Sequence, residues 1–249
     1  LPMSGSADTE RMPALALLAG GLATRLGPIT ATIPKSLVMV ASKPFIAHQL
    51  SRLAQQKITD VVVCTGYLGE QIESYVGDGS KFGVRVRYSA DGSKPLGTGG
   101  ALRRALPMLG ERFMVMYGDS YLQTSFLPIH AAFLASGRPA LMTVYRNVNQ
   151  IEQSNVEFAG GTIRSYDKVH HADAMHHIDY GLGILEASVL SARPTGAAFD
   201  LADLYQELAN KGLLAGFEVS ERFYEIGSPT GLAETDAFLR KTSNDRSKS

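Results

Sequence analysis

The feature of this sequence that most restricts its fold is the alternation of short apolar runs with segments of helical spacing. Residues 14–19, 60–65 and 113–117 are runs with almost no polar alternation, which is typical of strands covered on both faces. Residues 44–56 carry apolar side chains at helical spacing behind a proline in the first turn. This order predicts an α/β fold, with a mostly parallel sheet and helices on both of its faces.

After Arg146 the pattern changes to shorter strands and turns. Residues 156–158 and 162–166 flank the pair Gly160-Gly161, which predicts a β-hairpin. Two further helices are expected, one at 199–211 with Asp200 as its N-cap and a closing one at 229–241.

No linker separates these two parts of the chain. We therefore expect a single domain over residues 13–241, with a first half at about 13–146 and a smaller α+β lobe at about 147–241. Residues 1–12 and 242–249 are polar and have no apolar period, so both are expected to be disordered tails.

The composition excludes several classes of protein. The chain has 24 Lys+Arg against 24 Asp+Glu, whereas proteins that bind DNA or RNA usually have a strongly basic face. No apolar stretch near the N-terminus approaches the roughly 20 residues of a membrane span. The single cysteine, Cys64, excludes an intramolecular disulfide and suits a reducing compartment. We expect a cytoplasmic protein with no nucleic-acid and no membrane partner, and a homo-oligomer stays open.

Three loops should lie at the carboxyl ends of the strands, where open α/β sheets bind ligands. The first holds the pair Gly20-Gly21, then Thr24 and Arg25, and further on Lys35. Adjacent glycines let the backbone approach a ligand, and two cations supply the charge-assisted hydrogen bonds that a polyphosphate needs. This loop predicts polyphosphate binding, although it is neither a Walker A loop nor a Rossmann fingerprint. The alternative is a tight turn with surface charges.

The other two loops carry a glycine cluster and an acid. Gly97-Thr98-Gly99-Gly100 opens a helix, whose N-terminus favours a phosphate or a flat base; the alternative is a turn with an N-cap. Asp119 follows the run 113–117 and is predicted to hold Mg²⁺ against a phosphate, or else to cap the next segment. Since a single acid makes a one-ligand site, Glu225 is predicted to be the second metal ligand.

Residues 18–28 and 33–35 resemble the opening motif of the sugar-1-phosphate nucleotidyltransferases, or nucleotide-sugar pyrophosphorylases. Residues 95–102, the pair Gly118-Asp119 and residues 225–229 are similar to later landmarks of that family, in the same order. The resemblance covers nearly the whole chain. The stretch 95–102 is most similar to the D-glycero-D-manno-heptose 1-phosphate guanylyltransferase branch.

The resemblance implies the nucleotide-diphospho-sugar transferase fold, a Rossmann-like mixed sheet with a nucleotide half and a sugar half. It implies that a sugar 1-phosphate attacks the α-phosphate of an NTP, with GTP favoured, and that pyrophosphate leaves. Arg25 would hold the β- and γ-phosphates, and Lys35 would bridge the α-phosphate and the sugar phosphate. Mg²⁺ on Asp119 and Glu225 would offset charge. The nucleotide would be lined by Gly20, Gly21, Thr24, Gly97 and Thr98, and the sugar by Asp167, Lys168, Asp179 and Gly181.

The chain departs from the family pattern at Ser36, where Pro is frequent, and at Glu225, where Asp is usual. Asp167 occupies a position where the family has Glu, and Asp179 one where it has Asn. These two differences concern the identity of the sugar more than the reaction. Two other interpretations stay open. One is a catalytically idle nucleotide- or sugar-binding regulatory homologue. The other is a glycosyltransferase of similar fold, although Asp119-Ser120-Tyr121 lacks the second acid of an Asp-x-Asp motif. Three side chains are predicted to be core residues, Cys64, Met116 and Tyr117.

Overall fold

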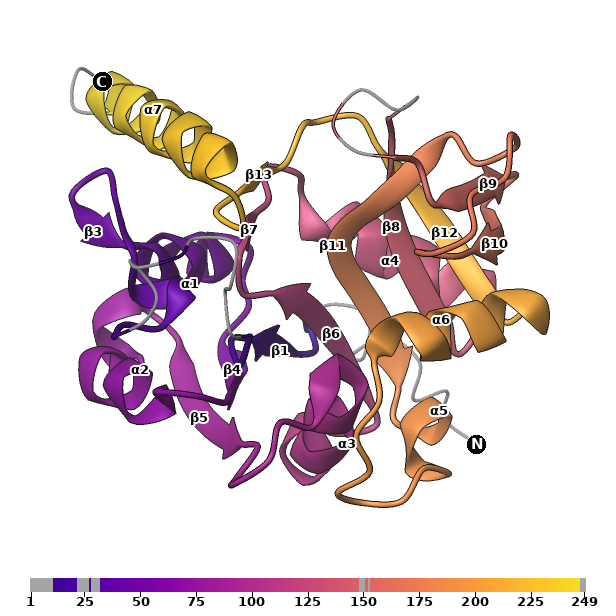
Figure 1. Ribbon diagram of the computed structural model, residues 1–249, viewed down its shortest axis with the longest axis horizontal. Helices are drawn as coiled ribbons and strands as arrows, with labels where there is room; N and C mark the ends of the chain where they lie inside the picture. Colours follow the sequence, from indigo (N-terminus) through magenta and orange to yellow (C-terminus); the bar gives the residue numbers. More distant parts are fainter. Residues whose placement is uncertain (1–10, 22–26, 28–31, 148–150, 152, 247–249) are drawn as a thin grey trace, which may run out of the picture.

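The computed structural model describes residues 11–21, 27, 32–147, 151 and 153–246, with side chains as far as 243. Its centre is a nine-stranded sheet in the order β5-β4-β1-β6-β11-β8-β12-β10-β9 (Figure 1). In chain order these strands are β1 (Ala14–Leu18), β4 (Asp60–Thr65), β5 (Arg85–Ala90), β6 (Arg112–Tyr117), β8 (Ala140–Arg146), β9 (Val156–Ala159), β10 (Thr162–Tyr166), β11 (His177–Glu186) and β12 (Leu214–Val219).

The sheet is mixed, and its two halves differ in strand direction. Strands β5, β4, β1 and β6 are parallel neighbours, as expected for the apolar runs of the first half. Strand β11 runs antiparallel between β6 and β8 and so joins the two halves into one sheet. The expected hairpin is present as β9 and β10, and Gly160 and Gly161 both have positive φ, as its tight turn requires.

Helices cover both faces of the sheet, which confirms the predicted layering. Successive residues of β1 point to opposite faces, so Leu15 and Leu17 pack in one core and Ala16 in the other. The first core includes side chains of α1 (Phe45–Gln55), α2 (Gly69–Val76) and α4 (Phe126–Ser136). The second includes those of α3 (Gly97–Leu109), α5 (Ser188–Ser191) and α6 (Leu201–Asn210). Among the described helices, none has the length and apolar character needed to cross a bilayer.

The ends of the domain differ from the sequence-based expectation. Met12 lies within the expected N-terminal tail, but it is 8% exposed and belongs to the first core. The closing helix α7 (Pro229–Arg246) continues past Lys241 into the expected C-terminal tail. The hydroxyls of Thr242 and Ser243 donate to backbone carbonyls four residues earlier, so these polar side chains are accommodated in the last helical turns.

A two-stranded ribbon lies beside the main sheet. It consists of β13 (Tyr224–Glu225), which pairs with β7 (Ser120–Tyr121) and not with the nine-stranded sheet. This pairing brings the start of α7 next to the loop that follows β6, which carries Asp119 (Figure 1).

Candidate functional site

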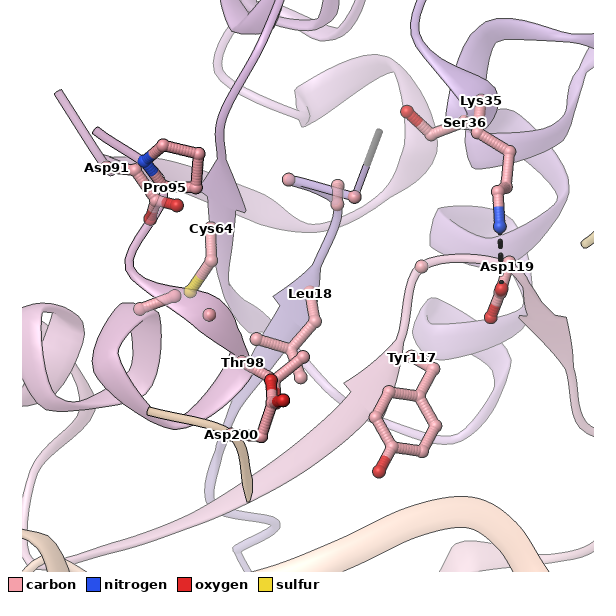
Figure 2. Close-up of a pocket in the computed structure, with 16 residues that line it drawn as sticks. Leu18, Lys35, Ser36, Cys64, Asp91, Pro95, Thr98, Tyr117, Asp119 and Asp200 are labelled. Atoms are coloured by element: carbon pink, nitrogen blue, oxygen red, sulfur yellow. Dashed lines mark hydrogen bonds and ion pairs between the residues drawn. The ribbon is translucent and has the colours of Figure 1, made fainter. Parts of the chain in front are cut away.

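A cavity of about 370 Å³ opens at the carboxyl ends of β1, β4 and β6, where the three predicted loops meet (Figure 2). Figure 2 shows Lys35 and Asp119 on one side of it and Asp91 and Pro95 on the other. The structure thus brings together residues from widely separated parts of the chain. The cavity is lined by Leu18, Ala19, Gly20, Gly21, Lys35, Ser36, Cys64, Asp91, Pro95, Gly97, Thr98, Ala101, Tyr117, Gly118, Asp119 and Asp200.

The first loop reaches the cavity through its glycines. Gly20 and Gly21 both line it. Gly20 lies against Gly66, where a Cβ would come within 2.7 Å of the Gly20 carbonyl oxygen, so the loops after β1 and β4 pack backbone against backbone. Thr24 and Arg25 lie outside the described residues.

The predicted convergence of Lys35 and Asp119 is present in the geometry. Lys35 begins the short helix η2 (Lys35–Leu37), and its Nζ lies 2.9 Å from Oδ2 of Asp119. The lysine side chain is 16% exposed and the carboxylate 31%, so the pair is only partly screened by water. Gly118 permits this placement, because a Cβ there would lie 2.4 Å from the Leu18 carbonyl oxygen.

The glycine cluster that opens α3 is used differently from the prediction. The N–H groups of Gly99 and Gly100 both donate to the carbonyl oxygen of Phe199, at 3.0 and 3.1 Å. These donors are therefore not free for a phosphate or a base, and the interpretation of this helix start as an exposed anion site is wrong for these two groups. The glycines let residues from the second half of the chain approach closely, since a Cβ at Gly99 would lie 2.3 Å from the Phe199 ring.

Gly97 and Thr98, which are predicted to line the nucleotide, lie in the cavity wall, but they too contact the second half of the chain. Gly97 has a φ of +70°, and a Cβ there would lie 2.6 Å from the Phe199 carbonyl oxygen. The Thr98 hydroxyl donates to Asp200 at 3.3 Å and accepts from the N–H of Leu201 at 2.7 Å. Asp200 is the expected N-cap of α6.

Glu225 is not turned toward the cavity. Its carboxylate accepts hydrogen bonds from the N–H of Gly227 and, at 2.6 Å, from the hydroxyl of Ser228, so it closes the turn before α7. Its backbone lies beside the Asp119 loop, because Glu225 pairs with Ser120 and the N–H of the next residue, Ile226, donates to the Asp119 carbonyl oxygen at 2.9 Å. The structure therefore does not place Glu225 as a second metal ligand beside Asp119.

The residues do fit a metal that is held largely by its substrate. Within the described parts of the chain, no three His, Cys, Asp or Glu side chains gather as a metal site. Mg²⁺ usually keeps several waters and binds through one or two carboxylates plus substrate phosphates. Asp119 offers such a carboxylate at the edge of the cavity.

Asp179 and Gly181, which are predicted to line the sugar, gather around Tyr117. The Tyr117 hydroxyl donates to Oδ2 of Asp179 at 3.0 Å, and the N–H of Gly181 donates to Oδ1 at 2.9 Å. Burial raises the pKa of Asp179, while nearby Lys168 and these hydrogen bonds act in the opposite direction. Gly181 has a φ of +97°, and a Cβ there would meet Ser120 Oγ at 3.2 Å.

Tyr117 is a site residue that the sequence analysis assigned to the core. It lines the cavity and, through its hydroxyl, contacts Asp179, so it links the cavity to the group of Asp179 and Gly181. Its place at the carboxyl end of β6, directly before Gly118, was the available signal. Met116 is buried in the core as predicted.

Asp167 and Lys168 have different surroundings. The Asp167 carboxylate accepts from the N–H groups of His170 and Val169, and these bonds lower its pKa to about 2. Gln206 also donates to it at 3.1 Å, so this acid is engaged in shaping its own loop. The Nζ of Lys168 lies 5.9 Å from the ring centroid of Tyr117, so it lies near the group formed by Tyr117, Asp179 and Gly181.

Asp91 and Cys64 also line the cavity, although the sequence did not predict them as site residues. Asp91 follows the carboxyl end of β5 and accepts from the N–H of Leu96 at 3.0 Å, which shapes the loop before α3; burial raises its pKa. Cys64 is buried as predicted but also lines the cavity. Burial, with a smaller effect of Asp91, raises the pKa of the Cys64 thiol to about 12, so it stays protonated at neutral pH.

Comparison with known proteins identifies the family. A family model described as nucleotidyl transferase matches residues 15–156. The N-acetylmuramate α-1-phosphate uridylyltransferase of Neisseria meningitidis is 42% identical over 224 residues, which are 89% of this chain and 96% of that protein. A UTP–glucose-1-phosphate uridylyltransferase of Synechocystis is 31% identical; the match covers 79% of this chain but 55% of that longer protein.

Solved structures agree on the fold. A UDP-glucose pyrophosphorylase complexed with UDP-glucose superposes with a TM-score of 0.77 at 17% identity, over 93% of this chain and 99% of that one. HddC from Yersinia pseudotuberculosis, complexed with GMP-PN, gives a TM-score of 0.74 at 21% identity, over 92% and 100%. The nucleotide-sugar pyrophosphorylase fold implied by the motifs is thereby confirmed. The family model spans more than half of the sequence, and this chain belongs to the nucleotidyl transferase family.

Proposed function

We propose that this enzyme transfers a nucleotidyl group from an NTP to a sugar 1-phosphate and releases pyrophosphate, with Mg²⁺ as cofactor. The observation that carries the proposal is the Lys35–Asp119 pair, set in a cavity at the carboxyl ends of three strands. A cation and a carboxylate in one partly buried place suit a metal-bound polyphosphate. The 42% identical relative is itself named as a uridylyltransferase of a sugar 1-phosphate.

In this reaction an oxygen of the sugar phosphate attacks the α-phosphorus, and the bond from the α-phosphorus to the pyrophosphate oxygen breaks. Such a transfer depends mainly on positioning and on neutralisation of charge. Lys35 would leave Asp119 and contact the α-phosphate and the sugar phosphate, which it could approach from the cavity wall. Arg25, by likeness to the family, would hold the β- and γ-phosphates. Mg²⁺ held by Asp119 and the phosphate oxygens would supply further neutralisation.

The remaining cavity residues would orient the two substrates. Gly20, Gly21, Gly97 and Thr98 line the wall where the base and ribose would lie, and Thr24 is assigned to the same side by likeness. On the other side of Tyr117, Lys168 would contact the sugar. Asp179 and Gly181 would shape its pocket, and Asp167 would act through its loop.

The choice of base is a finer part of the proposal. The likeness of residues 95–102 to the guanylyl branch favours GTP, whereas the relative from Neisseria meningitidis is a uridylyltransferase by name. No described polar side chain in the cavity distinguishes guanine from uracil by an evident hydrogen-bonding pattern.

The test is pyrophosphate release from each of the four common NTPs with a panel of sugar 1-phosphates. Lys35→Met and Asp119→Asn should lower kcat/KM by about 100-fold or more, the loss typical when one group that stabilises transition-state charge is removed. Lys57→Met and Asp78→Asn are the matched controls and should retain activity, because both residues are exposed and precede the amino ends of β4 and β5, at the opposite end of these strands from the cavity.

Other outcomes point to the alternative functions. NTP binding by calorimetry without turnover of any sugar 1-phosphate would indicate an idle regulatory homologue. Hydrolysis of a nucleotide sugar without pyrophosphorolysis would indicate a glycosyltransferase. Full activity of Asp119→Asn would overturn the role given to this acid.

A further inference from the structure

Gln49, on α1, is a fully buried polar side chain outside the cavity lining. It is 1% exposed and shares its helix with Ile46, Leu50 and Leu53, which are completely buried. Its Nε2 donates to the carbonyl oxygen of Ser120 at 2.8 Å and to that of Tyr117 at 3.2 Å. Both partners can only accept, so they determine which way the amide is turned.

The two carbonyls that Gln49 holds lie on either side of Gly118-Asp119. The amide therefore clamps the ends of the short loop that presents the Asp119 carboxylate. None of the described residues donates a hydrogen bond to the other half of the amide, Oε1. A buried acceptor without a partner is unfavourable, whereas the Nε2 half of the same amide makes two hydrogen bonds. The amide is thus oriented by the loop carbonyls alone.

The Asp119 backbone is held from three directions. The N–H of Gly118 donates to Leu18 at the end of β1, and the Asp119 carbonyl accepts from Ile226 after β13, both at 2.9 Å. Gln49 on α1 supplies the third attachment. With the backbone held in this way, the side-chain torsions of Asp119 decide whether its carboxylate meets Lys35 or a ligand in the cavity.

We propose that Gln49 is a positioning residue for catalysis, which fixes the loop so that the Asp119 carboxylate meets the metal-bound phosphates in the reactive geometry. The inference rests on the proposed function. Gln49 does not line the cavity and touches no substrate, so it acts through Asp119. Displacement of a catalytic group by about 1 Å can lower a rate by about 100-fold, and the loss of both clamping bonds frees the loop for such a shift.

The test compares Gln49→Met with Gln56→Met. Gln56, the C-cap of α1, joins the end of this helix to α4, since its Oε1 accepts from the N–H of Phe126 at 2.9 Å. This contact is at the start of α4 and not at the Asp119 loop. Gln49→Met should lower kcat by about 10- to 100-fold with a smaller change in KM for the NTP. Gln56→Met should leave kcat nearly unchanged. Hydrogen exchange of residues 117–121 should accelerate in Gln49→Met alone.

Gln49→Glu provides a second variant in case the methionine variant does not fold. Its ionised carboxylate would face two carbonyl oxygens, whereas the protonated acid donates to one of them. The ratio of its kcat to that of the unmodified enzyme should therefore rise as the pH falls from 8 to 6, which a purely structural role does not predict.

The outcomes separate this inference from the proposed function. If the enzyme is active and Gln49→Met does not change kcat, the positioning role is overturned and the proposed function is not. The same holds if Gln56→Met lowers kcat as much as Gln49→Met does. A flat kcat ratio for Gln49→Glu, in a folded variant, also overturns it. An unmodified enzyme that turns over no NTP with any sugar 1-phosphate overturns the function itself. In that case the hydrogen-exchange comparison still reports whether Gln49 holds the loop.

Discussion

Replacement of Gly99 by alanine should destabilise the protein through one contact, that with the Phe199 ring. The new Cβ would lie 2.3 and 2.4 Å from two ring carbons, whereas carbon atoms in contact are usually about 3.5–4.0 Å apart. The ring must therefore retreat by about 1 Å. That shift also strains the bonds from the N–H groups of Gly99 and Gly100 to the Phe199 carbonyl.

The expected change in the free energy of unfolding is the sum of two opposing effects. Overpacking of this kind costs about 1–3 kcal/mol, and the strained hydrogen bonds add to that cost. Alanine in place of glycine inside a helix returns about 1 kcal/mol. Gly99→Ala should therefore lower the free energy of unfolding by about 1–2 kcal/mol, measured by urea denaturation at neutral pH.

The same substitution in a protein that also lacks the Phe199 ring tests the steric explanation. In Phe199→Ala protein the ring is absent, so only the helix-propensity effect remains, and Gly99→Ala should then stabilise the fold by up to about 1 kcal/mol. A loss of stability that is the same in both backgrounds would refute the steric explanation and would place the requirement for glycine in the backbone itself.

Three further predictions follow from the site. Glu225→Ala removes the acceptor of the Gly227 and Ser228 donors before α7 and should lower the free energy of unfolding by about 1–2 kcal/mol in denaturation experiments; unchanged stability with weakened Mg²⁺ activation would instead place this carboxylate at the metal. Burial raises the folded-state pKa of Asp179 above its ordinary value of 3.8, so the folded protein binds this proton more tightly and the ionised acid opposes folding. Asp179→Asn should therefore increase stability at pH 8, and the gain should shrink as the pH falls through the folded pKa toward 3.8; a gain independent of pH would contradict this. Tyr117→Phe removes the hydroxyl that donates to Asp179 and should raise KM for the sugar 1-phosphate more than KM for the NTP in initial-rate assays, whereas equal changes would remove Tyr117 from the sugar side.

Part of the site was predictable because position along a parallel strand determines which end of the sheet a loop occupies. Lys35 and Asp119 were expected together on this ground, and the structure places them 2.9 Å apart. The same rule could have found Asp91 and Tyr117, which lie at the ends of β5 and β6. The sequence did not predict them as cavity residues, because the residue type at a strand end does not reveal whether the side chain points into the core or into a cavity. That direction depends on the side chains that pack beside it.

The direction of Glu225 illustrates a different limit. Its position near the loop that follows β6 agrees with the prediction, since β13 pairs with β7 and Ile226 contacts Asp119. Its carboxylate, however, engages the Gly227 N–H and the Ser228 hydroxyl two and three residues away. The choice between a local hydrogen bond and a distant ligand depends on rotamers that no pattern of residue types reveals.

The amino-acid sequence alone determined the layered α/β architecture, the three loops that meet at the cavity and the family. Apolar periodicity, turn residues and short motifs are properties of near neighbours in the chain. The tertiary structure decided which partners the polar groups take. In the folded protein the N–H groups of Gly99 and Gly100 donate to the Phe199 carbonyl, and the Glu225 carboxylate accepts from the turn before α7. The buried amide of Gln49 donates to a carbonyl of the Asp119 loop. The contacts of Gly99, Gly100 and Gln49 join residues that are close only after folding, and the local contact of Glu225 depends on the rotamer that its surroundings permit. Hydrogen bonds of that kind are selected by packing of the whole domain, not by local propensity.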